Sequence, residues 1–287
     1  MMIFRPGQRL VIPGVQVFQP RGTSAAASGI LDGISNVAAA YSLRKLRTAY
    51  AGSAVRVRRS SDSTEQDIGF DGTGEFDSAL FSSFVGGGTG FVKTWYDQSV
   101  NGYNATQTTT ANQPEIVLSA ANAKPALRFD GIDDSLQLAS ISLPQPISVI
   151  TMLKQISHVG NARIIALGGT AIVYQTGSSG DIVLYAGLGG DTRLNFGTSA
   201  YNICSALFNG NSSASRIWKN GGTPDSGSPG TASGTALFIG ANQSGTQNAN
   251  IDVADLIILS AAIDTADHNT IGADMATRYG LSWTTVT

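Results

Sequence analysis

Residues 125–139 read PALRFDGIDDSLQLA, two short apolar runs separated by Asp, Gly and Ser. This pattern predicts two β-strands, at 125–130 and 134–139, joined by a tight turn. The same alternation of apolar runs and turn residues extends from about residue 90 to residue 260. It predicts ten further strands, at 91–96, 114–119, 147–156, 162–167, 171–176, 181–186, 201–208, 215–219, 235–240 and 251–260. So many short strands indicate an all-β sandwich or jelly roll.

A few helices are expected around these strands. Residues 35–51 carry Ala39, Leu43, Leu46 and Tyr50 on one helical face and predict a first helix. Asp77 can cap a short second helix that runs to Phe84, and Asp264 can cap a closing helix that ends at Gly280. The sequence therefore predicts a mainly β domain at residues 31–287. Residues 1–30, rich in small residues at their end, are expected to be an N-terminal arm and linker.

The composition excludes several classes of protein. Charged residues make up 13% of the 287 residues, against about 25% in a typical domain, which argues against coiled coils and helical bundles. A net charge of −2 gives no basic field for nucleic-acid binding, and no apolar run is long enough for a membrane span. A single cysteine, Cys204, rules out an intrachain disulfide and a cysteine metal cluster. We therefore expect neither nucleic acid nor membrane insertion.

Basic residues are concentrated near the N-terminus. Residues 1–59 hold nine of the 18 Lys and Arg residues and a single acidic residue. One interpretation is a surface that docks on an acidic partner. The other is a solvated helix face formed by Arg44, Lys45 and Arg47. The sequence favours the second interpretation without excluding the first.

Five short segments resemble a known family in their order and approximate spacing. They are AYSLRKL at 40–46, VRVRRSSD at 55–62, DIG at 67–69, WYDQS at 95–99 and GYNA at 102–105. Together they resemble the catalytic domain of the arabinofuranosidase B family, although Val100 stands where that family usually has glycine. The resemblance implies a concanavalin A-like jelly-roll β-sandwich that acts on arabinose side chains of plant polysaccharide. LRFDGIDDSL at 127–136 is similar to a strand pair of laminin G-like and concanavalin-like modules.

The catalytic residues implied by this resemblance are not matched. The family uses a glutamate in the middle of the domain as nucleophile and an aspartate after a late strand as acid/base. The only glutamates here are Glu65, Glu75 and Glu115, and the late strand end at 238–242 carries Asn242 at the acid/base position. An amide cannot deliver a proton near neutral pH. The resemblance therefore predicts that the family's catalytic residues are absent. Hydrolysis remains open if Asp181 or Asp191 pairs with Asp252 or Asp255.

An arm followed by such a sandwich also resembles structural proteins of tailed bacteriophages. This predicts a non-catalytic virion protein, a capsid decoration or a tail-fibre head, that assembles as a homo-oligomer such as a trimer. Its expected location is the virion, its partners are other virion proteins contacted through residues 1–30, and a cell-surface glycan is a further candidate partner. The alternative is a glycoside hydrolase similar to the α-L-arabinofuranosidases, acting on a polysaccharide. The unmatched catalytic positions favour the non-enzyme interpretation.

Three residues are candidates for ligand contact: Trp95, Asp97 and Asn242. Trp95 could stack on a sugar ring, although an aromatic residue in a strand is more often part of the core. Asp97 could bond a ligand or close a structural hydrogen-bond network. No cofactor is predicted. The weak candidate for calcium is the group Asp130, Asp133 and Asp134, for which a tight turn is the favoured interpretation.

Overall fold

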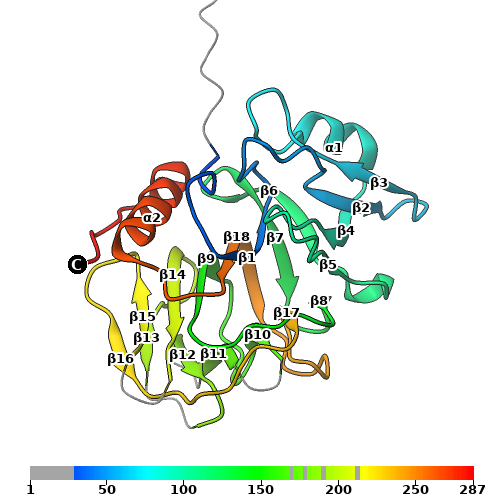
Figure 1. Ribbon diagram of the computed structural model, residues 1–287. Helices are drawn as coiled ribbons and strands as arrows, with labels where there is room; N and C mark the ends of the chain where they lie inside the picture. The colour runs from blue at the N-terminus through cyan, green and yellow to red at the C-terminus, as the bar shows by residue number, and fades with distance from the viewer. Residues whose placement is uncertain (1–28, 169–170, 177–179, 189–191, 211–213) are drawn as a thin grey trace, which may run out of the picture.

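The computed structural model describes residues 29–168, 171–176, 180–188, 192–210 and 214–287. Its strands are β1 (Val37–Ser42), β2 (Val55–Arg59), β3 (Glu65–Ile68), β4 (Gly90–Trp95), β5 (Ala105–Thr106), β6 (Glu115–Ala121), β7 (Lys124–Asp130), β8 (Leu136–Leu138), β9 (Ile147–Gln155), β10 (Arg163–Leu167), β11 (Ala171–Thr176), β12 (Asp181–Tyr185), β13 (Arg193–Asn195), β14 (Tyr201–Phe208), β15 (Ser215–Lys219), β16 (Asp225–Gly227), β17 (Leu237–Ile239) and β18 (Asn250–Leu259). The helices in these ranges are α1 (Ser78–Val85), α2 (Thr265–Tyr279) and a 3₁₀ turn at Thr110–Asn112. The all-β class predicted from the sequence is confirmed (Figure 1).

The strands form two layers. The first sheet has the order β16-β15-β14-β9-β18, and both β1 and β7 pair with the remaining edge of β18. The second sheet has the order β8-β17-β10-β11-β12-β13. Strands β6, β4 and β5 carry the hydrogen bonding from β7 across to β8, and β2 and β3 extend from β4. All of these pairings are antiparallel.

The main core lies between the two sheets. Successive side chains of a strand point to opposite faces, so Leu237 and Ile239 of β17 enter this core while Phe238 points outward. A second core lies on the outer face of the first sheet, where Ile271 and Met275 of α2 belong to one cluster with side chains of β9, β14 and β18. Strands β9, β14 and β18 are therefore buried on both faces, which explains their continuous apolar sequences.

Both predicted helix caps are confirmed. The Asp77 side chain accepts from the Leu80 N–H at 2.9 Å at the start of α1, and the Asp264 side chain accepts from the Asp267 N–H at 2.8 Å at the start of α2. Helix α2 ends at Gly280, whose left-handed φ of 63° suits glycine. In Figure 1, α2 (red) lies beside β14, and α1 lies with β2, β3 and β4 at the opposite side.

The predicted helix at residues 35–51 is wrong. Residues Val37–Ser42 form strand β1, in which all six residues are buried, and the chain from Leu43 onward is irregular. The helical spacing of the apolar residues did not indicate a helix, because the residues between them in β1 are buried as well and the segment has no polar face. The amide of Gln98 supplies backbone partners beyond the strand end, donating to the carbonyl oxygens of Ser42 and Arg44, both at 3.0 Å.

Most of the predicted arm, residues 1–30, lies outside the described residues, so the division at residue 30 stays a prediction. In the ranges that are described, no helix combines the length and the apolar character that a membrane crossing requires.

Gly240 provides a test of the packing between β17 and β7. Its φ is +82°, and a Cβ there would lie 2.3 Å from Cδ1 of the buried Phe129. We expect Gly240→Ala to lower the free energy of unfolding by about 2–4 kcal/mol, because it adds backbone strain and overpacking. Gly33→Ala is the control, since a Cβ there meets nothing within 4 Å. Equal midpoints of urea unfolding for the two variants would contradict this packing.

Candidate functional site

The two buried aspartates of β18 hold the first sheet together. Asp252 accepts hydrogen bonds from Nε of Arg128 at 2.8 Å and from the Tyr201 hydroxyl at 2.6 Å. Asp255 accepts from the Ser42 hydroxyl at 2.5 Å and from Nη2 of Arg44 at 3.2 Å. Both aspartates are 0% exposed. They are therefore closed to a substrate.

The other members of the pairs proposed from the sequence do not change this conclusion. Asp181, at the start of β12, accepts a hydrogen bond from Nδ2 of Asn195 at 2.8 Å. Asp191 lies outside the described residues. Because Asp252 and Asp255 are committed to buried ion pairs, neither can complete an open catalytic pair with Asp181.

Trp95 and Asp97 lie inside the molecule. Trp95 is 0% exposed, and its ring centroid is 5.6 Å from that of Tyr41. Oδ1 of Asp97 accepts from the backbone N–H groups of Ala40 and Ser99, each at 2.8 Å. These contacts join β1 to the segment after β4. Ligand contact by these two residues stays a prediction, and the Trp95 ring has no face open to a sugar.

Asn242 lies in the turn that follows β17. Its Oδ1 accepts from the Thr246 N–H at 2.9 Å, and its Nδ2 donates to Oε1 of Gln247 at 3.0 Å. The side chain is half-buried and stabilises the turn. Asn242 therefore lies at the rim of the second sheet, and its amide is largely occupied by the turn itself.

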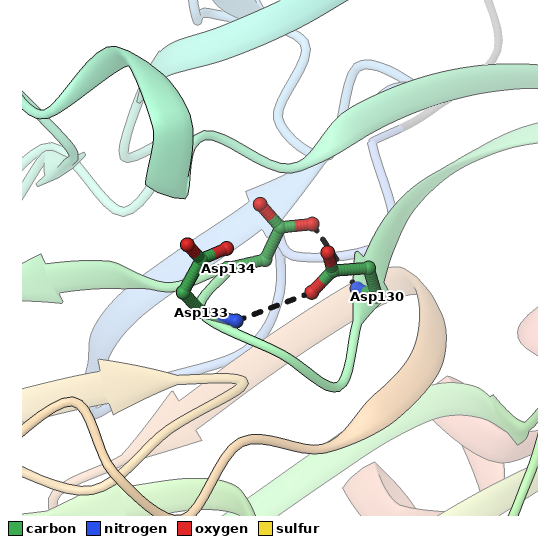
Figure 2. Close-up of side chains that lie close together, drawn as sticks. All are labelled: Asp130, Asp133 and Asp134. Atoms are coloured by element: carbon green, nitrogen blue, oxygen red, sulfur yellow. Dashed lines mark hydrogen bonds between the residues drawn. The ribbon is translucent and has the colours of Figure 1, made fainter.

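The turn between β7 and β8 gathers three carboxylates (Figure 2). One carboxylate oxygen from each of Asp130, Asp133 and Asp134 lies within 4.8 Å of the others. Oδ1 of Asp130 accepts from the Ile132 N–H at 2.8 Å, and Oδ2 of Asp134 accepts from the Asp130 N–H at 3.0 Å. The tight turn is the interpretation that the sequence favoured, and calcium binding by the same three residues, the weaker candidate, stays a prediction.

Asp134 differs from its neighbours in burial. It is 7% exposed, whereas Asp130 is exposed and Asp133 is half-buried. Burial, reinforced by the negative charge of Asp130, raises the pKa of the Asp134 carboxyl to about 7. About half of these carboxyls therefore hold a proton at neutral pH. A carboxyl of this kind can act as a general acid under ordinary conditions.

Asn248 joins the carboxylate turn to the Asn242 turn. Its Nδ2 donates to the carbonyl oxygen of Ile132 and to that of Gly245, the latter at 3.2 Å. The backbone N–H of Arg163, at the start of β10, donates to the Gln247 carbonyl at 2.8 Å. The two turns and the start of β10 thus form one continuous rim at the edge of the second sheet.

Aromatic side chains lie on the outer face of the same sheet. The rings of Tyr174 and Tyr185 meet edge-on with centroids 6.3 Å apart, and the Arg163 guanidinium lies 4.8 Å from the centre of the Tyr174 ring. Both tyrosines are half-buried and belong to a small cluster with Phe238. Partly exposed tyrosine rings of this kind suit contact with sugar rings. These tyrosines were not predicted from the sequence, although strand alternation places the side chain of Tyr174 on the opposite face from the buried Val173.

Comparison with known proteins agrees with the fold. Residues 31–127 match the family model described as alpha-L-arabinofuranosidase B, catalytic. The structure of an arabinofuranosidase complexed with arabinofuranosyl-α-1,2-xylobiose is similar with a TM-score of 0.69 and 15% sequence identity. A GH54 α-L-arabinofuranosidase soaked with a cyclic sulfate inhibitor is similar with a TM-score of 0.66 and 15% identity. The chain has the fold of an arabinofuranosidase.

The similarity covers part of those enzymes. Each match includes 83% of this chain and 62% of the arabinofuranosidase chain, so this protein spans about three-fifths of their length. No curated protein sequence matches the chain.

These findings correct the functional prediction made from the sequence. The expectation of a non-catalytic virion protein, a decoration or tail-fibre head, is wrong, because the family match and the similar structures are those of a glycoside hydrolase. The expectation that the chain is not an enzyme is overturned by the same findings. It rested on Asn242 and on the missing late glutamate, and it gave no weight to carboxylates supplied by the turn at 130–134.

The raised pKa of Asp134 predicts a particular dependence of stability on pH. The folded state favours the protonated carboxyl, so its contribution to stability is complete below about pH 4 and is lost as the pH rises through about 7. Asp134→Asn keeps an acceptor for the Asp130 N–H and removes the titration. We expect the variant to match the wild type at pH 4 and to be about 2–4 kcal/mol more stable at pH 8.

Urea unfolding at the two pH values measures this difference. Asp62→Asn is the control, because Asp62 is an exposed carboxyl bonded to Arg59, which lowers its pKa, so its loss should bring no gain at pH 8. A stability difference between Asp134→Asn and the wild type that is the same at both pH values would contradict the assignment.

Proposed function

We propose that this chain is a glycoside hydrolase that releases L-arabinofuranosyl groups from a polysaccharide, with the carboxylates of the turn at 130–134 as its catalytic groups. The observation that carries the proposal is the gathering of three carboxylate oxygens within 4.8 Å beside the turn of Asn242. The fold, and the match of residues 31–127 to an arabinofuranosidase catalytic domain, support a substrate of this class.

The arrangement suits a two-carboxyl mechanism. Retaining glycosidases place their two carboxyl groups about 5–5.5 Å apart, and here one oxygen of each carboxylate lies within 4.8 Å of the others. Asp134, buried and about half protonated at neutral pH, is the general acid. Asp133 is the nucleophile, because its carboxylate is half-buried and accepts no hydrogen bond from the described residues. Asp130 is engaged in the turn, where its Oδ1 holds two backbone N–H groups.

The steps follow from these roles. As the bond from the anomeric carbon to the leaving oxygen breaks, the Asp134 proton passes to that oxygen and the Asp133 carboxylate forms an ester with the sugar. Water then attacks the same carbon, Asp134 takes its proton, and the ester bond to Asp133 breaks. The half-buried rings of Tyr174 and Tyr185 offer an apolar surface for the polysaccharide on the adjoining sheet face.

Hydrolysis of 4-nitrophenyl α-L-arabinofuranoside tests the proposal. We expect release of 4-nitrophenol by the wild type. On an arabinose-bearing polysaccharide, whose leaving alcohol needs a proton, we expect a fall in kcat/KM of roughly 10²–10⁴ for Asp134→Asn, because general acid catalysis is lost. Asp133→Asn should cause a fall at least as large, since it removes the nucleophile. Asp62→Asn, which changes an exposed carboxyl bonded to Arg59, is the matched control and should leave the rate unchanged.

Two results would contradict the proposal. One is the absence of arabinose release by the wild type from both the nitrophenyl glycoside and an arabinose-bearing polysaccharide. The other is full activity in Asp134→Asn and Asp133→Asn, with unfolding transitions like that of the wild type.

A further inference from the structure

A polar cavity of about 740 Å³ lies away from the carboxylate turn. It is enclosed by the loop after β1, the glycine-rich turn at 69–74 and the last part of α2. None of its lining residues belongs to the carboxylate turn, to the Asn242 turn or to the tyrosine pair. Its volume lies within the range of ordinary small-molecule sites, about 300–1,000 Å³. The residues that matter below are Arg44, Lys45, Arg47, Tyr50, Phe70 and Arg278.

Two of the cationic side chains in this cavity are already paired. Arg44, 8% exposed, forms ion pairs with Asp255 at 3.2 Å and with Asp274 at 2.5 Å. Arg278 forms an ion pair with Glu75. Arg44 and Arg278 are therefore both committed to carboxylates of the protein itself.

The other two cations have no such partner. Among the described residues, neither Lys45 nor Arg47 has a carboxylate oxygen within 4.0 Å. The nearby Asp71 is occupied by its own loop, since its Oδ1 accepts from the N–H groups of Thr73 at 2.8 Å and Glu75 at 3.0 Å. Lys45 and Arg47 therefore have no ion-pair partner among the described residues, in a cavity that the carboxylates of Asp71, Glu75 and Asp274 also line.

Three arginine side chains of the cavity also carry buried donors without acceptors. Nε of Arg44, of Arg47 and of Arg278 is buried with no hydrogen-bond acceptor in the described part of the chain. Buried donors are nearly always satisfied in proteins, and exceptions are concentrated where a ligand or water completes the network. These Nε atoms are too deeply buried to contact a ligand in the cavity, so an anion would meet the half-buried side chains of Lys45 and Arg47.

One wall of the cavity is suited to a sugar ring. The rings of Tyr50 and Phe70 are half-buried and meet edge-on at 6.2 Å between centroids. Four glycines, Gly52, Gly69, Gly72 and Gly74, also line the cavity. Aromatic faces and exposed backbone amides are the groups that bind saccharides, whereas a bare phosphate needs no apolar surface.

We propose that this cavity is a second carbohydrate-binding site, which takes a uronate unit of the polysaccharide with its carboxylate between Lys45 and Arg47. The proposal deepens the proposed function, since the ligand is an acidic unit of the polysaccharide on which the carboxylate turn acts. It also agrees with the interpretation in which the basic residues of 1–59 dock on an acidic partner. Arg44, Lys45 and Arg47 lie in an irregular segment around a cavity, not on a solvated helix face.

Calorimetric titration of the full chain with trigalacturonate tests the site, with the fully methyl-esterified trisaccharide as the matched neutral ligand. We expect trigalacturonate to bind and the ester to bind at least about tenfold more weakly, because charged hydrogen bonds are lost. Lys45→Gln and Arg47→Gln should each weaken trigalacturonate binding by about tenfold or more. Arg216→Gln, which changes an exposed arginine of β15 outside the cavity, is the control.

Folding of the variants is checked by thermal unfolding. Arg47 donates from Nη1 to the Leu31 carbonyl at 2.6 Å, so its variant could lose stability, whereas the Lys45 side chain forms no ion pair with the described residues and its variant keeps the test valid. No binding of trigalacturonate overturns the proposal. So does equal binding by the wild type and Lys45→Gln, or binding of inorganic phosphate without binding of the trisaccharide.

The hydrolase proposal and the proposal of a uronate site can be contradicted independently of each other. Asp134→Asn should bind trigalacturonate as the wild type does. A protein that hydrolyses the nitrophenyl arabinofuranoside and ignores trigalacturonate overturns the second site alone. A protein that binds trigalacturonate through Lys45 and cleaves no arabinofuranoside supports the second site and overturns the hydrolase proposal.

Discussion

Strand β18 imposes the constraint on which the rest of the structure depends. It pairs with β9 on one edge and with β1 and β7 on the other, and both of its faces are covered. It nevertheless carries Asp252 and Asp255, both fully buried. An unpaired carboxylate in such a place lowers the stability of the folded state by several kcal/mol. The fold must therefore place Arg128 beside Asp252 and Arg44 beside Asp255.

The two ion pairs also position the two proposed sites. Arg128 lies opposite Asp252 in the register of β7 and β18, and two residues along the strand Asp130 lies opposite Asn250. The Arg128–Asp252 pair therefore fixes the end of β7 from which the carboxylate turn begins. Toward the other end of β18, Arg44 reaches Asp255 and lines the polar cavity. One central strand is thus linked to both proposed sites through its buried ion pairs.

Much of the fold could be predicted from local patterns, and the exceptions have physical causes. Strand alternation after residue 90 and the caps at Asp77 and Asp264 act within a few residues, so they are visible in the sequence. The helix expected at 35–51 failed because Gln98, more than 50 residues away, bonds that backbone. The carboxylate turn was visible as a sequence motif. The raised pKa of Asp134 was not visible, because it depends on burial. The non-enzyme interpretation came from matching Asn242 and a missing late glutamate to the family's catalytic positions.

The account depends most on the claim that the turn at 130–134 performs hydrolysis with closely spaced carboxylates. Proton NMR of the first sugar released from 4-nitrophenyl α-L-arabinofuranoside reports the configuration at its anomeric carbon. Spacing within 4.8 Å leaves no room for a water molecule between the acid and the opposing carboxylate, so the account predicts that the α configuration is retained. Release of the β anomer as the first product, or release of no sugar, would contradict it.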